Sequence, residues 1–398
     1  EMCIRDRINS NIIRKINAAR VFHGIRKNPS ISPQGLSKDT GIDLATISII
    51  LASLEQDGLV ERSQGERTGR SGRPNSQLNI NEKTGVLVGV AVDVDESELV
   101  LCSFAGTILA NLHVPGSKDQ EMVIAAIKSG IATLLKQTGY PRKALAGVGV
   151  GVPGLVGLDG KLALAPNLDW HDVDFGAALA ASLAVPVQLE NDIKAAAAAE
   201  HLFGQGAPDA DFIYLSGRSG VGGGLYLGGA IYRGPRGMAG EVGHMKLVPN
   251  GRPCACGGFG CFEAYISERA IFERLRDAKL NFPDIAAVRE AALRGEAGVR
   301  AVLAECGQHL GLGLANLANI FAPGRIVLGG AMAVLAEYLL PAARPVFEAN
   351  ALREIGGEIA ISVSTLGEFA VPMGGIAIAL QHFLEEPHVA MLRPGVQA

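Results

Sequence analysis

The sequence predicts a multidomain α/β protein with a small, mainly helical module at its N-terminus. At 398 residues the chain exceeds the usual size of one domain. Hydrophobic residues make up 48% of it and charged residues 19%, which suffices for large cores and excludes a largely disordered chain. From Thr84 onward, Gly-rich apolar segments alternate with Ala-rich helical segments, which is the pattern of an α/β fold.

The N-terminal module is predicted from capping residues and apolar periodicity. Ser32 precedes a short helix that Gly41 ends, and Asp43 is placed to cap the next helix. The elements indicated are helices over 10–28, 33–40 and 43–58, followed by a strand over 59–62. Two short helices around a Gly-containing turn and a following strand are typical of a winged helix-turn-helix. We therefore expect a DNA-binding head over 9–64, a basic linker over 65–83 and a body over 84–386.

The charge distribution supports this division. Residues 1–83 contain 13 Lys and Arg against 9 Asp and Glu, and the remainder contains 23 against 31. A basic head on an acidic body suits a nucleic-acid-binding module attached to a sensor or enzyme. Within the linker, Arg67, Arg70 and Arg73 are spaced by three on a Gly-rich arm, which suits minor-groove or phosphate contacts as well as a plain solvated linker.

The third helix offers few side chains for reading DNA bases. It contains no Lys or Arg, and its exposed candidates are Thr46 and Ser48. We expect the arginines of the arm to supply much of the affinity for DNA.

A cysteine cluster predicts a metal site in the body. Three of the six cysteines fall within eight residues, after a histidine, in the order His244, Cys254, Cys256 and Cys261. One imidazole and three thiolates complete a tetrahedral Zn²⁺ shell, so the ion in the loop 244–261 is expected to be structural. Three ordinary buried cysteines beside an unrelated histidine are the alternative.

The body also shows an internal repeat and two candidate ligand segments. Three closely spaced strands over 85–112 are matched by a similar unit over 211–232, which suggests two related lobes around a cleft. Asp192 follows a buried strand, where it can take a proton or only hydrogen-bond, and Asn191-Asp192 can equally cap the next helix. The Gly-rich turn 219–224 suits either a phosphate or a plain hairpin.

Taken together, these segments resemble the ROK family of bacterial repressors, open reading frames and sugar kinases. The match rests on Gly240–His244 followed by CACGGFGCFE, with support from 151–154, 165–168 and 190–192, and it covers about residues 9–386. The winged helix and the SGRP segment resemble the repressor branch in particular. The resemblance implies an actin-like, ribonuclease-H-like two-lobed fold with a sugar in its cleft.

The resemblance also implies the ligand residues. The side chains expected to hydrogen-bond sugar hydroxyls are Asn167, Asn191, Asp192, Glu241, His244 and Glu263. His244 would use one ring nitrogen for zinc and present the other to the sugar, so that zinc fixes the imidazole. Several polar side chains in one site penalise a wrong hydroxyl pattern.

One segment departs from the kinases of the family. Active members carry Asp-x-Gly-Gly-Thr, whose glycines cradle ATP phosphates, whereas the aligned segment here runs from Asp93 to Ser97 with carboxylates at Asp95 and Glu96. These carboxylates add bulk and repel phosphate, and Arg218 replaces a usual Gly in the second phosphate turn. Loss of kinase activity is therefore expected, and Asp192 would be the catalytic base only if activity persists.

The function predicted is a sugar-responsive transcription regulator, most simply a repressor of carbohydrate metabolism. An ATP-dependent sugar kinase with a DNA-binding head is the alternative, and a regulator controlled by another protein is a third. We expect a cytoplasmic homodimer or homotetramer that binds operator DNA without membrane contact, because no leader pattern opens the chain. The choice among glucose, xylose, N-acetylglucosamine and their phosphates stays open.

Overall fold

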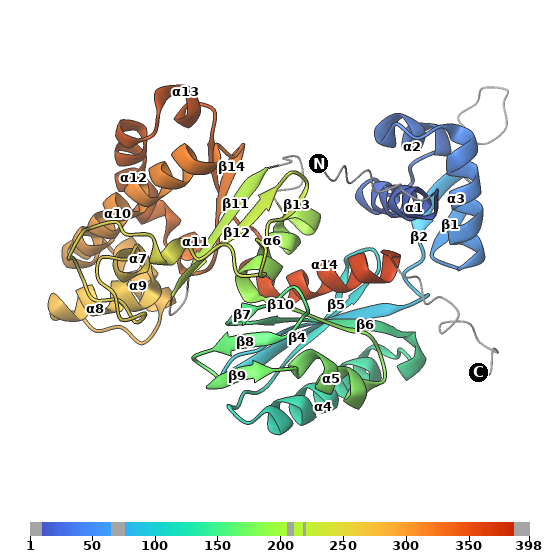
Figure 1. Ribbon diagram of the computed structural model, residues 1–398, viewed down its shortest axis with the longest axis horizontal. Helices are drawn as coiled ribbons and strands as arrows, with labels where there is room; N and C mark the ends of the chain where they lie inside the picture. Colours follow the sequence, from blue (N-terminus) through green and yellow to red (C-terminus); the bar gives the residue numbers. More distant parts are fainter. Residues whose placement is uncertain (1–9, 65–75, 205–210, 218–219, 386–398) are drawn as a thin grey trace, which may run out of the picture.

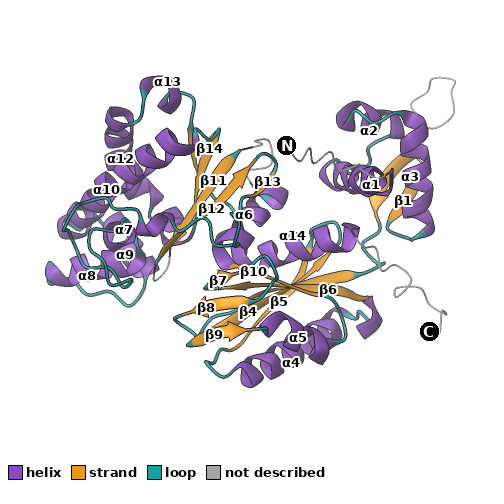
Figure 2. Cartoon of the chain, viewed as in Figure 1, coloured by secondary structure: helices purple, strands orange, loops and turns teal. Residues whose placement is uncertain are grey.

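The computed structural model describes residues 10–64, 76–204, 211–217 and 220–385, which form a head and a two-lobed body (Figure 1). Helices and strands alternate through the body, as the sequence predicts for an α/β chain (Figure 2). Among these residues, no helix combines the length and apolar character that a bilayer crossing needs.

The head contains the three predicted helices. They are α1 (Ser10–Lys27), α2 (Pro33–Thr40) and α3 (Leu44–Gln56). The Ser32 hydroxyl accepts a hydrogen bond from the Gly35 amide at 3.1 Å, and the Asp43 carboxylate accepts one from the Thr46 amide at 2.9 Å. Both caps satisfy amides that a helix start leaves without partners, so the predicted helix starts are confirmed.

The wing of the head is a two-stranded antiparallel sheet. Its strands are β1 (Val60–Gln64) and β2 (Ser76–Ile80), paired from Val60 opposite Ile80 to Gln64 opposite Ser76. The stretch expected to be a linker over 65–83 therefore contains the second wing strand, and the head extends to Ile80. Leu78 is fully buried in the core of the head, which explains why this strand packs there.

The first lobe is built on a five-stranded sheet in the order β10-β6-β3-β4-β5. The strands are β3 (Val86–Ala91), β4 (Glu96–Ser103), β5 (Ile108–Pro115), β6 (Leu145–Val152) and β10 (Val187–Asn191). The first three form an antiparallel meander, and β6 and β10 run parallel to β3. A small sheet of β7 (Leu155–Val156), β8 (Leu162–Ala165) and β9 (Trp170–Val173) is attached to this lobe.

The second lobe repeats the same strand order, β13-β12-β11-β14-β15. Its strands are β11 (Phe212–Gly217), β12 (Val221–Leu227), β13 (Ala230–Ile231), β14 (Arg325–Leu328) and β15 (Ala360–Val363). Again three strands form an antiparallel meander and two follow in parallel. The duplication that the sequence suggests is confirmed at the level of topology.

Helices cover both sheets. On the first lobe, α4 (Gln120–Thr138) and α5 (Phe175–Leu183) cover one face and α14 (Ala370–Glu385) the other. On the second lobe, α6 (Asp192–Phe203) covers one face. The remaining helices lie on or near its other face: α7 (Glu263–Ile266), α8 (Glu268–Asp277), α9 (Ile285–Leu293), α10 (Ala297–Phe321), α11 (Gly330–Val334), α12 (Ala336–Asn350) and α13 (Arg353–Gly356). Single 3₁₀ turns occur at Arg142–Ala144, Val242–His244 and Gly367–Phe369.

The helices α6 and α14 connect the two lobes. They cross so closely that a Cβ added at Gly374 of α14 would lie 2.1 Å from the carbonyl carbon of Ala195 in α6. Only glycine permits this approach of the two backbones. Because α14 lies on the first sheet and α6 on the second, this crossing holds the lobes together.

Candidate metal centre and ligand site

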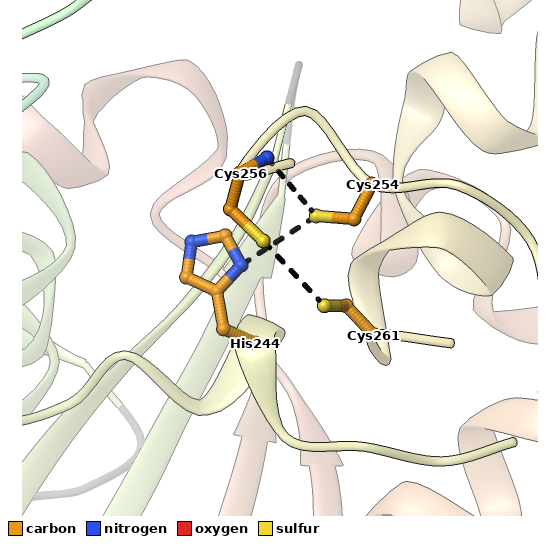
Figure 3. A group of neighbouring side chains, drawn as sticks. All are labelled: His244, Cys254, Cys256 and Cys261. Carbon is orange, nitrogen blue, oxygen red and sulfur yellow. Dashed lines mark hydrogen bonds between the residues drawn. The ribbon is translucent and has the colours of Figure 1, made fainter. Parts of the chain in front are cut away.

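Four side chains converge in the second lobe to form a candidate metal centre. Their ligand atoms, on His244, Cys254, Cys256 and Cys261, all lie within 4.8 Å of one another (Figure 3). His244 Nδ1 is 3.7 Å from Cys254 Sγ, and Cys256 Sγ is 3.8 Å from Cys261 Sγ. A tetrahedral zinc site with metal–sulfur bonds of about 2.3 Å has edges of about 3.8 Å, so these spacings suit Zn²⁺.

The backbone brings these side chains together through tight turns. The 3₁₀ turn at Val242–His244 presents His244, and the Cys254 amide donates to the Gly258 carbonyl at 2.8 Å to close the cysteine loop. Gly260 has φ +70°, and a Cβ there would lie 1.7 Å from the Val248 carbonyl oxygen. The loop can therefore wrap around a small ion only with glycine at this position.

Lys246 adds a positive charge beside the cluster. Its Nζ donates to Cys261 Sγ at 2.9 Å, and this hydrogen bond raises the pKa of Lys246. Three thiolates and a neutral imidazole around Zn²⁺ carry a net charge of −1, which a nearby ammonium offsets. Sequence reasoning missed this residue, although its place two residues after His244 would have been a signal.

Glu263 lies beside the metal centre. Its side chain is buried at the start of α7, where Oε1 lies 2.7 Å from Cys254 Sγ and 3.6 Å from His244 Nδ1. Its other oxygen accepts a hydrogen bond from the Val221 amide at 3.4 Å. Glu263 is thus held by the same loop that would hold the metal.

Asn191 and Asp192 lie where β10 ends and α6 begins. The Asn191 amide oxygen accepts hydrogen bonds from the amides of Ile193 and Lys194, both at 3.1 Å, so Asn191 is the N-cap of α6. Its Nδ2 donates to the Gly154 carbonyl at 3.0 Å and to Asp192 Oδ1 at 2.9 Å. Of the two roles that the sequence leaves open for Asn191-Asp192, Asn191 takes that of the helix cap. Its side chain also fixes the carboxylate of Asp192.

Asp192 has a strongly altered acidity. The pKa of its carboxyl is raised to about 7, chiefly by burial and also by the charges of Asp93 and Glu241, against a hydrogen bond from the Ile193 amide that lowers it. A carboxyl that titrates near neutrality is suited to accepting or donating a proton on a hydroxyl. The charge of Glu241, which precedes the metal loop, thus acts on Asp192 at the start of α6.

Of the remaining expected sugar ligands, Glu241 and His244 lie close together and Asn167 lies in a separate turn. Glu241 Oε2 lies 3.9 Å from His244 Nε2, while the other ring nitrogen of His244 faces Cys254. Asn191 thus contacts Asp192, and Glu241, His244 and Glu263 form a second group of neighbours. Asn167 lies in an exposed turn between β8 and β9.

A second polar cluster behind the site was missed from the sequence. Glu190 is buried and accepts a hydrogen bond from Arg233 Nε at 2.7 Å, and buried Lys194 donates to the Gly237 carbonyl at 2.5 Å. Burial lowers the pKa of Lys194. These contacts fix the loop before Glu241 against α6, and their partners are more than 40 residues apart, so spacing could not reveal them.

The segment aligned with the phosphate motif is a turn into β4. Glu96 begins this strand, and its carboxylate lies 3.4 Å from His113 Nδ1 on β5. Asp93 rather than Asp95 is the acid whose charge acts on Asp192. Arg218 and Ser219 of the second phosphate turn lie outside the described residues.

In the head, α3 carries the two expected base-contacting residues. Ser48 is exposed but donates its hydroxyl to the Leu44 carbonyl at 2.7 Å, and Thr46 lies in the first turn that Asp43 caps. Arg67, Arg70 and Arg73 lie outside the described residues.

A winged-helix head on a duplicated, kinase-like α/β body with a Cys₃His cluster defines a class of ligand-responsive DNA-binding proteins. Residues 87–382 match the ROK family and residues 17–71 the MarR family. The chain belongs to the ROK family, with a MarR-type winged-helix head. This confirms the resemblance and the fold that it implies.

Relatives of known function extend across the whole chain. The chain is 32% identical over 388 residues to the xylose repressor of Bacillus subtilis, covering 96% of this chain and 99% of that one. It is 28% identical over 397 residues to the transcriptional dual regulator NagC of Escherichia coli, covering 95% and 97%. Both of these relatives are transcription regulators, and each match covers at least 95% of both chains.

Solved structures show the same fold. A ROK family transcriptional regulator, homologous to the Escherichia coli Mlc protein, superimposes with a TM-score of 0.81 at 25% identity, covering 96% of this chain and 98% of that one. A ROK glucokinase from Streptomyces griseus, solved with glucose and AMPPNP, gives a TM-score of 0.66 at 29% identity, covering 75% and 100%. The kinase matches a shorter part of this chain than the regulator does.

Proposed function

We propose that this protein is a sugar-responsive repressor that binds operator DNA through its winged helix and senses a sugar or sugar phosphate in the body. The observation that carries the proposal is the combination, in one chain, of the head with the polar set Asn191, Asp192, Glu241, His244 and Glu263. The names of the relatives support a sugar as effector. The protein would act in the cytoplasm, as an oligomer that presents two heads to two half-sites.

Zinc would be held by His244, Cys254, Cys256 and Cys261. Four protein ligands leave no position open for water, so the ion would be structural. It would fix the imidazole of His244 and the loop that ends in Glu263, and thereby the positions of two sugar ligands.

Sugar recognition would use donors and acceptors from both lobes. Asn191 ends β10 of the first lobe, whereas Asp192 begins α6, and Glu241, His244 and Glu263 also belong to the second lobe, so a sugar bound to all five would bridge the lobes. Asn167 would contribute from the turn between β8 and β9. Ligand binding would then shift the angle between the lobes and with it the position of the head.

A sugar kinase with a DNA-binding head is the second candidate. It is favoured by the pKa of Asp192, raised by burial to about 7, which suits a base that takes a proton from a sugar hydroxyl. The carboxylates of Asp95 and Glu96, where kinases of the family carry glycines, favour the repressor. We therefore propose that the chain is not an active kinase.

A thermal-shift series would test the proposal. The purified protein would be heated with D-xylose, N-acetyl-D-glucosamine, D-glucose and their phosphates, each with and without ATP-Mg²⁺, because only ligands of the native state raise the melting temperature. A shift with one sugar that is absent in Asp192→Ala, with no shift from ATP-Mg²⁺, supports the sensor. No shift with any sugar would refute it, and phosphoryl transfer to a sugar would establish the kinase.

A further inference from the structure

A polar contact between the head and the body lies at the C-terminal end of α6. Arg26 of α1 donates from Nη2 to the carbonyl oxygen of Leu202 at 2.7 Å. Its guanidinium also lies over the ring of Phe203, 4.9 Å from the ring centre. The last four carbonyls of a helix lack intrahelical partners and carry its negative dipole end, so a guanidinium there is both a cap and a favourable charge.

The opposite end of the same helix forms part of the proposed sugar site. Asn191 caps α6 and Asp192 is its first residue. Twelve residues separate the two ends, which corresponds to about 18 Å at 1.5 Å per residue. One straight helix therefore joins the site to the head.

α6 is confined along its length, so it can move only as a unit. Gly374 of α14 contacts the backbone at Ala195, as described above. On the other side, a Cβ at Gly224 of β12 would lie 2.4 Å from the Cβ of Ala197. Ala-rich faces in such close contact leave no room for a local change of shape. A shift at Asp192 is therefore carried to Phe203.

The other contact of the head with the body is of a different kind. α14 packs on α1 within an apolar cluster that includes Val21, Phe22 and Ile25 of the head and Ile376 and Phe383 of α14. Apolar packing has no preferred direction. The hydrogen bond and ring contact of Arg26 require a defined geometry, so they set the angle of the head.

The polar atoms at this junction are incompletely satisfied. Within the described part of the chain, Arg26 Nε, His23 Nδ1 and His201 Nδ1 are buried without a hydrogen-bond partner. A buried polar atom without a partner destabilises the arrangement that buries it. These atoms therefore lower the stability of the docked arrangement at this junction.

We propose that α6 transmits occupancy of the sugar site to the head, and that Arg26 is the positioning residue that receives the signal. This inference rests on the proposed function, since it assigns the regulation of the same site. Sugar binding would move the start of α6, and the Leu202 carbonyl and Phe203 ring would move Arg26 and α1 with them.

Amide hydrogen exchange with and without sugar tests the transmission. Full-length protein would be exposed to D-xylose, N-acetyl-D-glucosamine or D-glucose, and exchange followed at 191–194 and across α1. In the wild type, we expect the sugar that protects 191–194 to change exchange in α1 several-fold. In Arg26→Gln, the change at 191–194 should persist and the change in α1 should be lost.

Three further variants separate signal transmission from stability. Arg26→Lys keeps a donor for the Leu202 carbonyl and should restore part of the response, and Phe203→Leu should weaken it. Arg20→Gln is the matched control, because Arg20 lies on the same helix and donates to a carbonyl within the head, that of Thr40. Its response should equal that of the wild type.

The outcomes distinguish the two proposals. If no sugar changes exchange at 191–194, the proposed function fails and the inference fails with it. If a sugar protects 191–194 but leaves α1 unchanged in the wild type, or if Arg26→Gln responds like the wild type, only the transmission through α6 is overturned.

Discussion

Glu263 Oε1 lies 2.7 Å from Cys254 Sγ, so an expected sugar ligand contacts an expected zinc ligand. The same oxygen is 3.6 Å from His244 Nδ1, which faces the centre of the cluster. A change in the metal centre would therefore act directly on the proposed sugar site, without an intervening element.

Cys256→Ser should remove zinc and weaken sugar binding together. Cys256 is the exposed member of the cluster, and loss of a ligand should lower zinc affinity by more than about 100-fold, since outer partners of a metal site already contribute about 10- to 100-fold. Metal analysis and calorimetry with sugar measure the two effects. Cys306→Ala, a buried cysteine of α10, should retain one zinc per chain. Full zinc in Cys256→Ser would contradict the ligand assignment.

Asp192→Asn should stabilise the protein in a pH-dependent way. The folded-state pKa of Asp192, about 7, exceeds the unfolded value of about 3.9, so the folded state binds more protons and loses stability as pH rises from about 4 to 7. At pH 8 the variant should be more stable by about 4 kcal/mol, and near pH 4 the difference should vanish. Thermal unfolding at both pH values measures this. Glu348→Gln, at an exposed acid of α12, should show no such trend.

Protonation of His23 at low pH should destabilise the packing of the head. The folded-state pKa of His23 is lowered to about 3, chiefly by burial and also by the charges of Arg26 and His201. Stability from the neutral ring is complete above pH 6.5 and falls as the pH drops below it, by about 1.4 kcal/mol between pH 7.5 and 5.5. His201 adds to the trend, because burial, Arg26 and Lys27 lower its pKa as well. Hydrogen exchange of α1 should rise less with acid in His23→Gln than in the wild type, and equal slopes would disprove the role of His23.

The arginines of the arm should set the salt dependence of DNA binding. If Arg67, Arg70 and Arg73 each contact a phosphate, replacing all three by Gln lowers the slope of log affinity against log salt by about 2.7. Fluorescence anisotropy with operator DNA at several salt concentrations measures this slope. An unchanged slope would mean that the arm does not contact phosphates, and Ser48→Ala, which keeps every charge, should leave the slope as it is.

Local signals in the sequence predicted the elements whose causes are local. The caps at Ser32 and Asp43 and the cysteine cluster follow from residue types at short spacing. The repeat of strand order was also visible, because each meander consists of neighbouring strands. The resemblance to the ROK family then predicted the fold of the whole body.

What the sequence did not reveal depends on contacts between distant residues. The strand 76–80 follows a Gly-rich basic arm that is typical of a linker, and only pairing with β1 and burial of Leu78 define it. The bond from Arg26 to Leu202 joins positions 176 residues apart, and no periodicity in α1 indicates it. Lys246 likewise needs the folded loop to meet Cys261.

The short connection between the wing and the first strand of the body affects which operators the protein can bind. Only residues 81–85 separate β2 from β3, and the Asn81 amide is bonded to the Leu59 carbonyl at 2.9 Å while the Thr84 hydroxyl donates to the Gly58 carbonyl. Because this connection is short and hydrogen-bonded to the head, it restricts the position of the head relative to the body. In an assembly of two copies, the bodies would therefore fix the distance between the two heads. Operators whose half-sites differ in spacing by a few base pairs would then be distinguished by the geometry of the bodies rather than by the reading helices.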